Sequence, residues 1–264
     1  MLELKDLHKT FNPGTVNAKT ALDGLSLTLR DGEFVTVIGG NGAGKSTMLN
    51  AAAGTLSVDS GEVHLDGVDV TDLPEYKRAA YIGRVFQDPM MGTAPSMHIE
   101  ENLALAARRG QKRGLRWGIT KAERERYRAL LGDLGLGLET RLSSEVSTLS
   151  GGQRQALTLL MATLKSPKLL LLDEHTAALD PKTAAKVMAL TDRIVTREKL
   201  TTLMITHNMR DAIQYGSRLV MLHEGRVILD ISGEEKKNLT VSDLLAQFAR
   251  VSGDEFASDR ALLS

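Results

Sequence analysis

Alternating apolar and polar residues predict a small sheet near the start of the chain. The alternation runs over residues 2–9 and again over Ser26–Leu29, where the turn pair Asp31-Gly32 follows. In a strand such alternation gathers the apolar side chains on one face. Phe11 lies between the two segments and directly precedes the turn signal Asn12-Pro13-Gly14. The pattern leaves two interpretations of Phe11 open, a packing residue or a ligand contact.

Two apolar runs predict strands of a buried, mostly parallel sheet. Phe34–Ile38 precedes a glycine-rich loop, and Leu169–Leu172 ends at the acids Asp173 and Glu174. The second run is continuous rather than alternating, which is typical of a parallel strand covered on both faces. A helical pattern over residues 181–197 and a strand pattern over residues 201–206 add a further βαβ unit. Residues 60–67 predict a further strand between two turns, Tyr81–Phe86 a short strand, and residues 219–228 a final hairpin.

Helical periodicity dominates the middle of the chain. The first helix is expected over residues 45–53 and ends at Gly54. A longer helical pattern spans Ile99–Leu131 with interrupting glycines, and another runs from Ser150 to the stop at Ser166-Pro167. We therefore expect a helical subdomain, about residues 88–165, inserted into the sheet domain.

Composition narrows the classes of function. The 264 residues are 42% hydrophobic and carry 33 basic and 33 acidic residues, so the net charge is zero and gives no field of the kind that nucleic-acid binders use. The absence of cysteine excludes disulfides, thiolate zinc sites and cysteine nucleophiles. No apolar run reaches the length of a membrane span, and the first residues lack the apolar core of a signal peptide. We expect a soluble chain that binds no nucleic acid, whose metal, if any, uses oxygen or histidine ligands.

A phosphate-binding loop is the first candidate site. Residues 39–46 read Gly-Gly-Asn-Gly-Ala-Gly-Lys-Ser, the pattern G-x-x-x-x-G-K-S, and lie between an expected strand and an expected helix. Glycines let the backbone N–H groups turn toward phosphate oxygens, and the helix adds its positive end. Lys45 would reach the β- and γ-phosphates and Ser46 would bind Mg²⁺. The alternative is a glycine-rich turn without a ligand.

The acids after the buried strand form the second candidate site. Asp173 and Glu174 stand at the carboxyl end of a parallel strand, where ligands bind in open α/β sheets. Asp173 would hold the Mg²⁺ shell, and Glu174 would polarise the water that attacks the γ-phosphate. The alternative is that two acids merely end a strand at the surface.

The stretch Leu149–Gln153, Leu-Ser-Gly-Gly-Gln, predicts a second phosphate cradle at the start of a helix. One nucleotide does not need two cradles. With this stretch the sequence resembles the ATP-binding cassette (ABC) family of transport ATPases, over residues 2 to about 230 and in the family's order. The resemblance implies an α/β fold: a P-loop NTPase core with a mostly parallel central sheet, an N-terminal antiparallel β subdomain and an inserted α-helical subdomain. It places the ATP-binding domain at residues 1–233 and leaves residues 234–264 as an extension with one short helix.

The resemblance also assigns roles to single residues. Phe11 would stack on adenine, Gln87 would sense Mg²⁺ and the attacking water, and His207 would be the switch histidine that contacts the γ-phosphate. Glu174 would be the catalytic base, so the catalytic set is Glu174, His207 and Gln87. The implied metal ligands are Ser46, Gln87 and Asp173. The residues implied to bind ATP are Phe11, Gly39, Gly40, Asn41, Gly42, Ala43, Gly44, Lys45, Ser46, Thr47, Ser150, Gly151, Gly152, Gln153 and Asp180.

The resemblance implies a function as well. A stand-alone subunit would bind ATP and Mg²⁺ and hydrolyse ATP at the interface of a head-to-tail homodimer, powering transport through separate permease chains at the inner face of the cell membrane. The stretch Val85–Pro89 is similar to cassettes paired with solute-binding-protein importers, which favours import, with amino acids as the substrate class. The alternatives are the ATPase of an exporter or lipid-extraction complex, a soluble cassette ATPase outside transport, and a regulatory module that holds ATP without hydrolysis.

Three features depart from the family pattern or lie outside its motifs. His175 stands where similar cassettes carry proline. It is either a structural substitution or a group that makes hydrolysis pH-sensitive between about pH 6 and 7.5. A basic cluster is either a solvated face or a contact with lipid head groups or a permease; it comprises Arg108, Arg109, Lys112, Arg113 and Arg116, beside Trp117. Met90, Met91 and Met97 suit a docking groove or irregular core packing.

Overall fold

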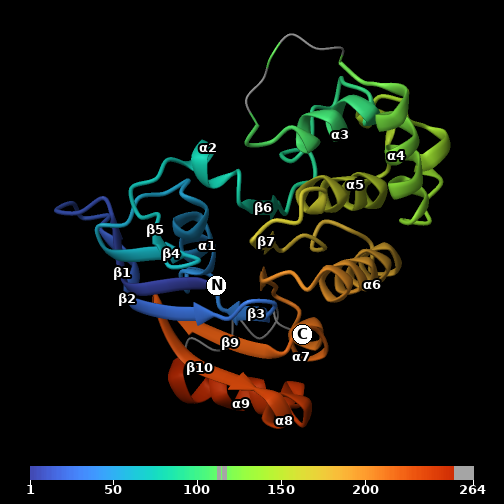
Figure 1. Cartoon of the computed structure of the whole chain (residues 1–264). Coiled ribbons are helices and arrows are strands. Elements are labelled where there is room, and N and C mark those ends of the chain that lie inside the picture. Colours follow the sequence, from blue (N-terminus) through green and yellow to red (C-terminus); the bar gives the residue numbers. More distant parts are fainter. Residues whose placement is uncertain (112–113, 115–117, 253–264) are drawn as a thin grey trace. The chain divides into compact units, whose positions relative to one another are not determined.

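The computed structural model describes residues 1–111, 114 and 118–252, which fall into two units. Unit 1 comprises Met1–Arg78 and the described chain from Lys199 onward, and unit 2 comprises Ala79–Glu198. Figure 1 shows the chain coloured along its sequence, with unit 2 running from the turquoise strand β6 to the light-orange helix α6.

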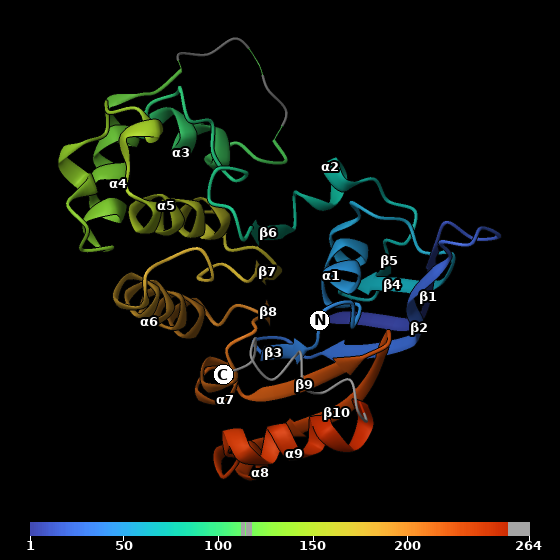
Figure 2. The same ribbon diagram turned by 180° about the vertical axis from the view of Figure 1, so that it is seen from behind.

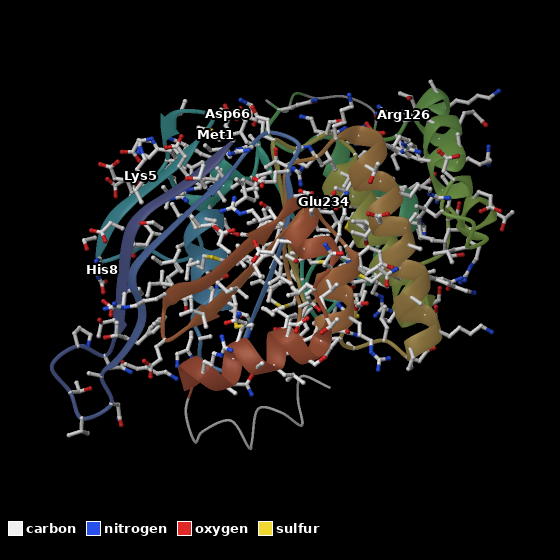
Figure 3. The ribbon with its side chains drawn as sticks, turned by 90° about the horizontal axis from the view of Figure 1, so that it is seen from below. Met1, Lys5, His8, Asp66, Arg126 and Glu234 are labelled. Carbon is white, nitrogen blue, oxygen red and sulfur yellow. The ribbon has the colours of Figure 1, made fainter. Side chains whose placement is uncertain are left out.

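An antiparallel sheet in unit 1 confirms the strands expected near the start of the chain. Its order is β2-β1-β4-β5, with β1 (Leu2–Phe11), β2 (Lys19–Leu29), β4 (Ser60–Leu65) and β5 (Val68–Asp69). The β1–β2 hairpin is longer than the alternation predicted, because register shifts interrupt the period of two while the pairing continues to Phe11. Lys5 and His8 project from β1 in Figure 3.

The second sheet segment of unit 1 is built around β3 (Phe34–Gly39), which is buried along its whole length. β3 pairs in parallel with β8 (Thr202–Ile205) and β9 (Arg218–His223). β10 (Arg226–Ser232) pairs antiparallel with β9, which confirms the expected hairpin. The buried central strand ends in the glycine-rich loop, so the sheet fixes where that loop begins.

The helices of unit 1 are α1 (Lys45–Ala53), α2 (Glu75–Arg78), α7 (Met209–Gln214), α8 (Gly233–Lys237) and α9 (Val241–Ser252). The expectation of a single helix after Gly233 is wrong. Two glutamates in the first turn of α8 and two lysines in its last turn suit the opposite ends of a helix dipole and support this additional short helix. In Figure 2 helix α9 runs beside β10. Its Leu244 and Phe248 are buried with Ile38 and Met221, so α9 belongs to the core of unit 1.

The described residues of unit 2 form two paired strands and four longer helices. β6 (Ile82–Val85) and β7 (Leu169–Asp173) pair in parallel, which confirms the continuous apolar run as a buried strand. The helices are α3 (Ile99–Ala107), α4 (Lys121–Gly132), α5 (Gly151–Thr163) and α6 (Pro181–Glu198). The long helical pattern with its interrupting glycines thus contains the two helices α3 and α4. Within the described ranges no helix is both long and apolar enough to cross a membrane.

Unit 1 combines the parallel pairs of β3 with β8 and β9 and the antiparallel β2–β1–β4–β5 sheet, and unit 2 contains the parallel pair of β6 and β7. The fold is therefore α/β with mixed sheets, as the sequence predicted.

Candidate nucleotide-binding site

The glycine-rich loop joins the end of β3 to the start of α1 and leaves no room for side chains at two positions. Gly39 has φ 154° and Gly44 has φ 100°. A Cβ atom at Gly39 would collide with the carbonyl oxygen of Leu222, and one at Gly44 with the carbonyl oxygen of Ala21. Both obstacles are backbone atoms that cannot swing aside. The tight approach explains why glycine is required at both positions.

Lys45 opens helix α1 and is buried although it carries a charge. Its Nζ donates hydrogen bonds to the carbonyl oxygens of Gly39 at 2.8 Å and Gly40 at 3.0 Å. The loop therefore holds an ammonium group against its own backbone. An ammonium group also forms strong, charge-assisted hydrogen bonds with phosphate oxygens. Ser46 is exposed at the same helix end, so its hydroxyl is open to a ligand.

Phe11 and His207 belong to the same unit as this loop. Phe11 ends β1 and is 38% exposed, which disfavours the interpretation that it is a core packing residue. His207 follows β8 and directly precedes Asn208, the N-cap of α7. The Asn208 side chain accepts hydrogen bonds from the N–H groups of Arg210 and Asp211, so the backbone beside His207 is fixed.

The end of β7 in unit 2 carries the two acids. Asp173 is the last strand residue, and its Oδ2 lies 3.3 Å from a guanidinium nitrogen of Arg84 on the paired strand β6. The Arg84 guanidinium also lies over the Phe86 ring, 4.6 Å from its centroid. The sequence analysis missed Arg84. Its only sequence signal is a charge inside an otherwise apolar strand.

Glu174 has a backbone conformation that is rare for glutamate. Its φ is 45°, in the left-handed region that costs non-glycine residues energy and recurs at functional sites. The turn directs the chain from β7 into the loop that leads to α6. Gln87 is exposed shortly after β6, the strand that pairs with β7. The structure thus places Asp173 at the carboxyl end of β7, with Glu174 and Gln87 just beyond the carboxyl ends of the adjacent parallel strands β7 and β6.

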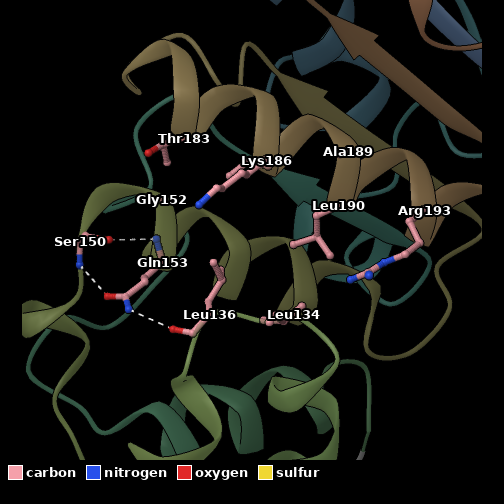
Figure 4. Close-up of a pocket in the computed structure, with 12 residues that line it drawn as sticks. Leu134, Leu136, Ser150, Gly152, Gln153, Thr183, Lys186, Ala189, Leu190 and Arg193 are labelled. Carbon is pink, nitrogen blue, oxygen red and sulfur yellow. Dashed lines mark hydrogen bonds between the residues drawn. The ribbon is translucent and has the colours of Figure 1, made fainter.

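The Ser-Gly-Gly-Gln stretch begins α5 with a reciprocal cap. Ser150 Oγ accepts a hydrogen bond from the Gln153 N–H at 3.3 Å, and Gln153 Oε1 accepts one from the Ser150 N–H at 3.2 Å. Gln153 Nε2 donates to the Leu136 carbonyl at 3.2 Å, as Figure 4 shows. Because Ser150 Oγ acts as an acceptor inside the cap, its O–H proton can be donated outward to a phosphate oxygen.

A second contact ties this stretch to α6. A Cβ atom at Gly152 would collide with Cγ2 of Thr183, so the helices α5 and α6 approach closely at this glycine. Asp180 caps the start of α6 by accepting a hydrogen bond from the Thr183 N–H at 3.1 Å. The Thr183 hydrogen bonds lower the pKa of Asp180. Behind the contact lies a cavity of about 640 Å³, lined by Leu136, Lys186 and other side chains drawn in Figure 4. The sequence analysis missed Thr183.

His175 is a buried structural residue. Its Nε2 lies 3.0 Å from Thr191 Oγ1, and that hydroxyl donates to the carbonyl oxygen of Val187. Thr191 must therefore accept from His175, which places the proton of the neutral ring on Nε2. Burial lowers the pKa of His175 to about 4. The hypothesis that this ring titrates between about pH 6 and 7.5 is wrong, because a desolvated imidazole without a negative partner resists protonation.

Comparison with known proteins places these motifs in a family. The family model described as "ABC transporter" matches residues 22–177, more than half of the chain. A curated relative, the tyrosine transport ATP-binding protein of Clostridioides difficile, is 49% identical over 248 residues, which cover 94% of this chain and 98% of the relative.

The chain belongs to the ABC transporter family. The methionine import ATP-binding protein MetN of Bartonella henselae is 35% identical over 86% of this chain and 64% of the relative. The dimeric, post-hydrolysis structure of the ATP-binding cassette MJ0796 bound to ADP and Pi has a TM-score of 0.75 and 31% identity, covering 88% of this chain and 98% of that one. The chain is therefore an ABC ATPase with a P-loop NTPase core, and it binds and hydrolyses ATP.

Two arginines of the basic cluster have partners inside unit 2. Arg108 pairs with Glu123 at 2.9 Å, and Arg109 donates to the carbonyl oxygen of Ala162. These two members of the basic cluster therefore serve the internal structure of unit 2. The other members lie outside the described residues; they are Lys112, Arg113 and Arg116, with the adjacent Trp117. Met90 and Met91 are exposed, at 41% and 69%, which leaves the docking interpretation of this loop as a prediction.

Replacing Gly152 by Ala is expected to lower the kcat of the cassette roughly 10- to 100-fold, because overpacking against Thr183 costs about 1–3 kcal/mol and displaces the start of α5. The double variant Gly152→Ala/Thr183→Ser removes the obstructing methyl group and should recover most of the loss. Gly132→Ala is the control, since a Cβ atom there meets nothing within 4 Å. The kcat for ATP hydrolysis is measured for all three variants. If Thr183→Ser does not restore the activity of Gly152→Ala, the loss is not caused by overpacking between Gly152 and Thr183.

The buried His175 predicts a stability change in acid. A folded chain keeps the ring neutral to about pH 4, whereas an unfolded chain protonates it near the ordinary value of 6.5. The unfolded state therefore binds more protons in this window, and the free energy of unfolding falls by about 2–3 kcal/mol as the pH drops through it. Urea unfolding of the wild type and of His175→Gln at pH 7, 5.5 and 4.5 measures how much of the pH dependence of the free energy of unfolding comes from His175. Equal pH dependence in both proteins would show that the ring contributes nothing.

Proposed function

We propose that the ATP site of this cassette is composite. The phosphate-binding loop of one copy would hold the nucleotide, and the Ser150–Gln153 stretch of a second copy would cover its γ-phosphate in a head-to-tail homodimer. The observation that carries this proposal is that two separate glycine-rich stretches, residues 39–46 and 150–153, each lead into the start of a helix. The dimeric structures of the related cassette MJ0796 support it.

The residue roles follow from the two cradles. Phe11 stacks on adenine, and residues 39–47 wrap the phosphates with Lys45 between the β- and γ-groups. Asp180, at the start of α6, lies in the loop that communicates across the dimer. The ATP-binding domain extends over residues 1–233, with a helical subdomain at about residues 88–165. Exposed Phe11 and buried Lys45 support these roles, because the first offers a ring face and the second an ammonium group.

The implied Mg²⁺ ligands are Ser46, Gln87 and Asp173, which offer a hydroxyl, an amide oxygen and a carboxylate. Such a hard-oxygen set suits Mg²⁺, which usually takes one or two carboxylates together with substrate phosphates. Among the described residues, no group of three or more acidic, histidine or cysteine side chains gathers as a self-sufficient metal cage. In this proposal the ion arrives together with the nucleotide, whose phosphates supply further oxygen ligands. When bound, Mg²⁺ would neutralise the charge on the phosphates.

Hydrolysis is assigned to Glu174 and His207. Glu174 accepts a proton from the attacking water, and the strained turn at its backbone holds the carboxylate beyond the end of β7. Gln87 helps to place the water. His207 donates a hydrogen bond to the γ-phosphate from the fixed backbone before α7.

The cassette powers import through separate permease chains at the inner face of the cell membrane, and a solute-binding protein delivers the substrate. The name of the Clostridioides relative, a tyrosine transport ATP-binding protein, and that of the import protein MetN support an amino acid as substrate. Spermidine/putrescine relatives of Haemophilus and other bacteria are 32–33% identical, but the chain spans only about three fifths of their length. Amino-acid import is therefore the substrate class that the similarity supports best.

Uptake by reconstituted vesicles tests this function. The cassette is purified together with its membrane partner, placed in vesicles with internal ATP, and offered labelled tyrosine, methionine and spermidine with the solute-binding protein outside. We expect saturable uptake of an amino acid by the wild type and none by a Glu174→Gln complex. Uptake of spermidine alone would overturn the substrate class. Efflux from preloaded vesicles without uptake would overturn import.

A further inference from the structure

The end of the β1–β2 hairpin places a cation beside the aromatic residue expected to bind adenine. Phe11 and Lys19 are paired directly across the two strands. Residues paired in this way project from the same face of a sheet, about 5 Å apart at their Cβ atoms. Both side chains are exposed. The hairpin thus presents a ring and an ammonium group side by side.

The Lys19 side chain reaches the phosphate-binding loop. Its Nζ lies 2.9 Å from the position that a Cβ atom at Gly42 would occupy. Gly42 is in the middle of the loop, has φ 78° and is exposed. Both Lys19 and Gly42 belong to unit 1, so this proximity is internal to one unit. A second ammonium group therefore stands over the loop that also carries Lys45.

Among the described residues, no acidic group accounts for the position of Lys19. Within the described part of the chain, Lys19 makes no ion pair and no hydrogen bond, in contrast to Lys9, which pairs with Asp59 at 2.7 Å. The start of α1 is a region of positive potential, because its N–H groups point toward the loop. A lysine is disfavoured there unless an anion balances it. The placement of Lys19 indicates that the balancing anion is the ligand.

We propose that Lys19 is a further nucleotide-binding residue, which contacts the polyphosphate from the hairpin side as a second cation beside Lys45. The proposal rests on the proposed role of residues 39–47 as the phosphate loop. The favoured ligands are adenosine di- and triphosphates: Phe11 binds the base, and the paired Lys19 reaches the phosphates. A nucleoside monophosphate carries less negative charge near Gly42, so its affinity should depend less on Lys19.

Equilibrium binding of ATP, ADP and AMP to Lys19→Met, Lys19→Arg and the wild type tests the proposal. One charge-assisted contact corresponds to about a 5- to 10-fold change in affinity. We expect Lys19→Met to weaken ATP and ADP binding by that factor, to affect AMP less, and to reduce the salt dependence of ATP binding. Lys19→Arg should retain most of the affinity. Lys5→Met is the control of equal charge change, since Lys5 lies elsewhere on β1 and pairs with Glu3.

Two results would overturn the proposal. One is an unchanged affinity of Lys19→Met for ATP and ADP. The other is an equal loss for all three nucleotides together with a lowered melting temperature, which would mean that the hairpin has lost its structure. A Lys45→Met variant measured alongside distinguishes a failure of the Lys19 proposal from a failure of the proposed phosphate loop. If Lys45→Met binds ATP as the wild type does, the phosphate loop itself is misassigned. If Lys45→Met loses ATP and Lys19→Met does not, only the role of Lys19 fails.

Discussion

Replacing Glu174 by Gln is expected to lower the kcat for ATP hydrolysis about 10²- to 10⁴-fold while ATP still binds. Removing a general base costs this factor because the attacking water keeps its proton in the transition state. The amide is nearly the same size as the carboxylate, so the turn at φ 45° and the end of β7 should persist. The nucleotide then remains intact, and the variant should accumulate as an ATP-bound dimer.

Phosphate release and light scattering on the same sample measure both effects. Glu198→Gln is the matched control, because Glu198 is exposed at the end of α6 and pairs only with its neighbour Arg197 among the ion pairs that the structure describes. Hydrolysis by Glu174→Gln at the wild-type rate would show that another group is the base. A monomeric variant with ATP bound would show that closure of the dimer requires something other than intact nucleotide.

Replacing Lys45 by Met is expected to weaken ATP binding on the order of 100-fold or more. The buried ammonium group is held by the carbonyl oxygens of Gly39 and Gly40, 2.8 and 3.0 Å away, and charge-assisted bonds to phosphate contribute about 1.5–3 kcal/mol each. Methionine fills the same space without the charge, so the loop between β3 and α1 should keep its course.

Binding of a fluorescent ATP analogue measures the loss, and a melting curve checks that the fold is intact. Lys237→Met serves as control, since this exposed lysine on α8 pairs with Glu234. If Lys45→Met keeps wild-type affinity for ATP, the buried ammonium does not contact phosphate and the glycine-rich loop has another purpose.

The elements predicted best are those with a local cause. Phe34–Gly39 and Leu169–Asp173 could be predicted as strands because both are rich in apolar residues, and the second is continuously apolar. The end of α1 could be predicted because Gly54 suits the left-handed conformation, φ 79°, that it adopts there. The site motifs were equally local. Where the backbone approaches a carbonyl oxygen too closely for a side chain, the sequence must have glycine at that position. The tight approaches at Gly39 and Gly44 are consistent with that prediction.

The contacts that could not be predicted join residues far apart in the sequence. Arg84 meets Asp173 only because β6 pairs with β7, and Thr183 meets Gly152 only because α6 packs on α5. Neither residue belongs to a motif. His175 shows the same limit, because its low pKa depends on burial against α6, which is a property of the packing rather than of its neighbours in sequence.

The composite site is the central claim, and a crosslink between copies tests it most directly. The chain has no cysteine, so single cysteines can be introduced without a background. Asn41→Cys marks the phosphate loop and Gly151→Cys marks the start of α5; both positions are exposed. With a short bismaleimide and ATP, in the Glu174→Gln background, a mixture of the two variants should give a covalent heterodimer, and neither variant alone should do so. A mixture that stays monomeric with ATP bound would contradict the claim that one copy covers the nucleotide of another.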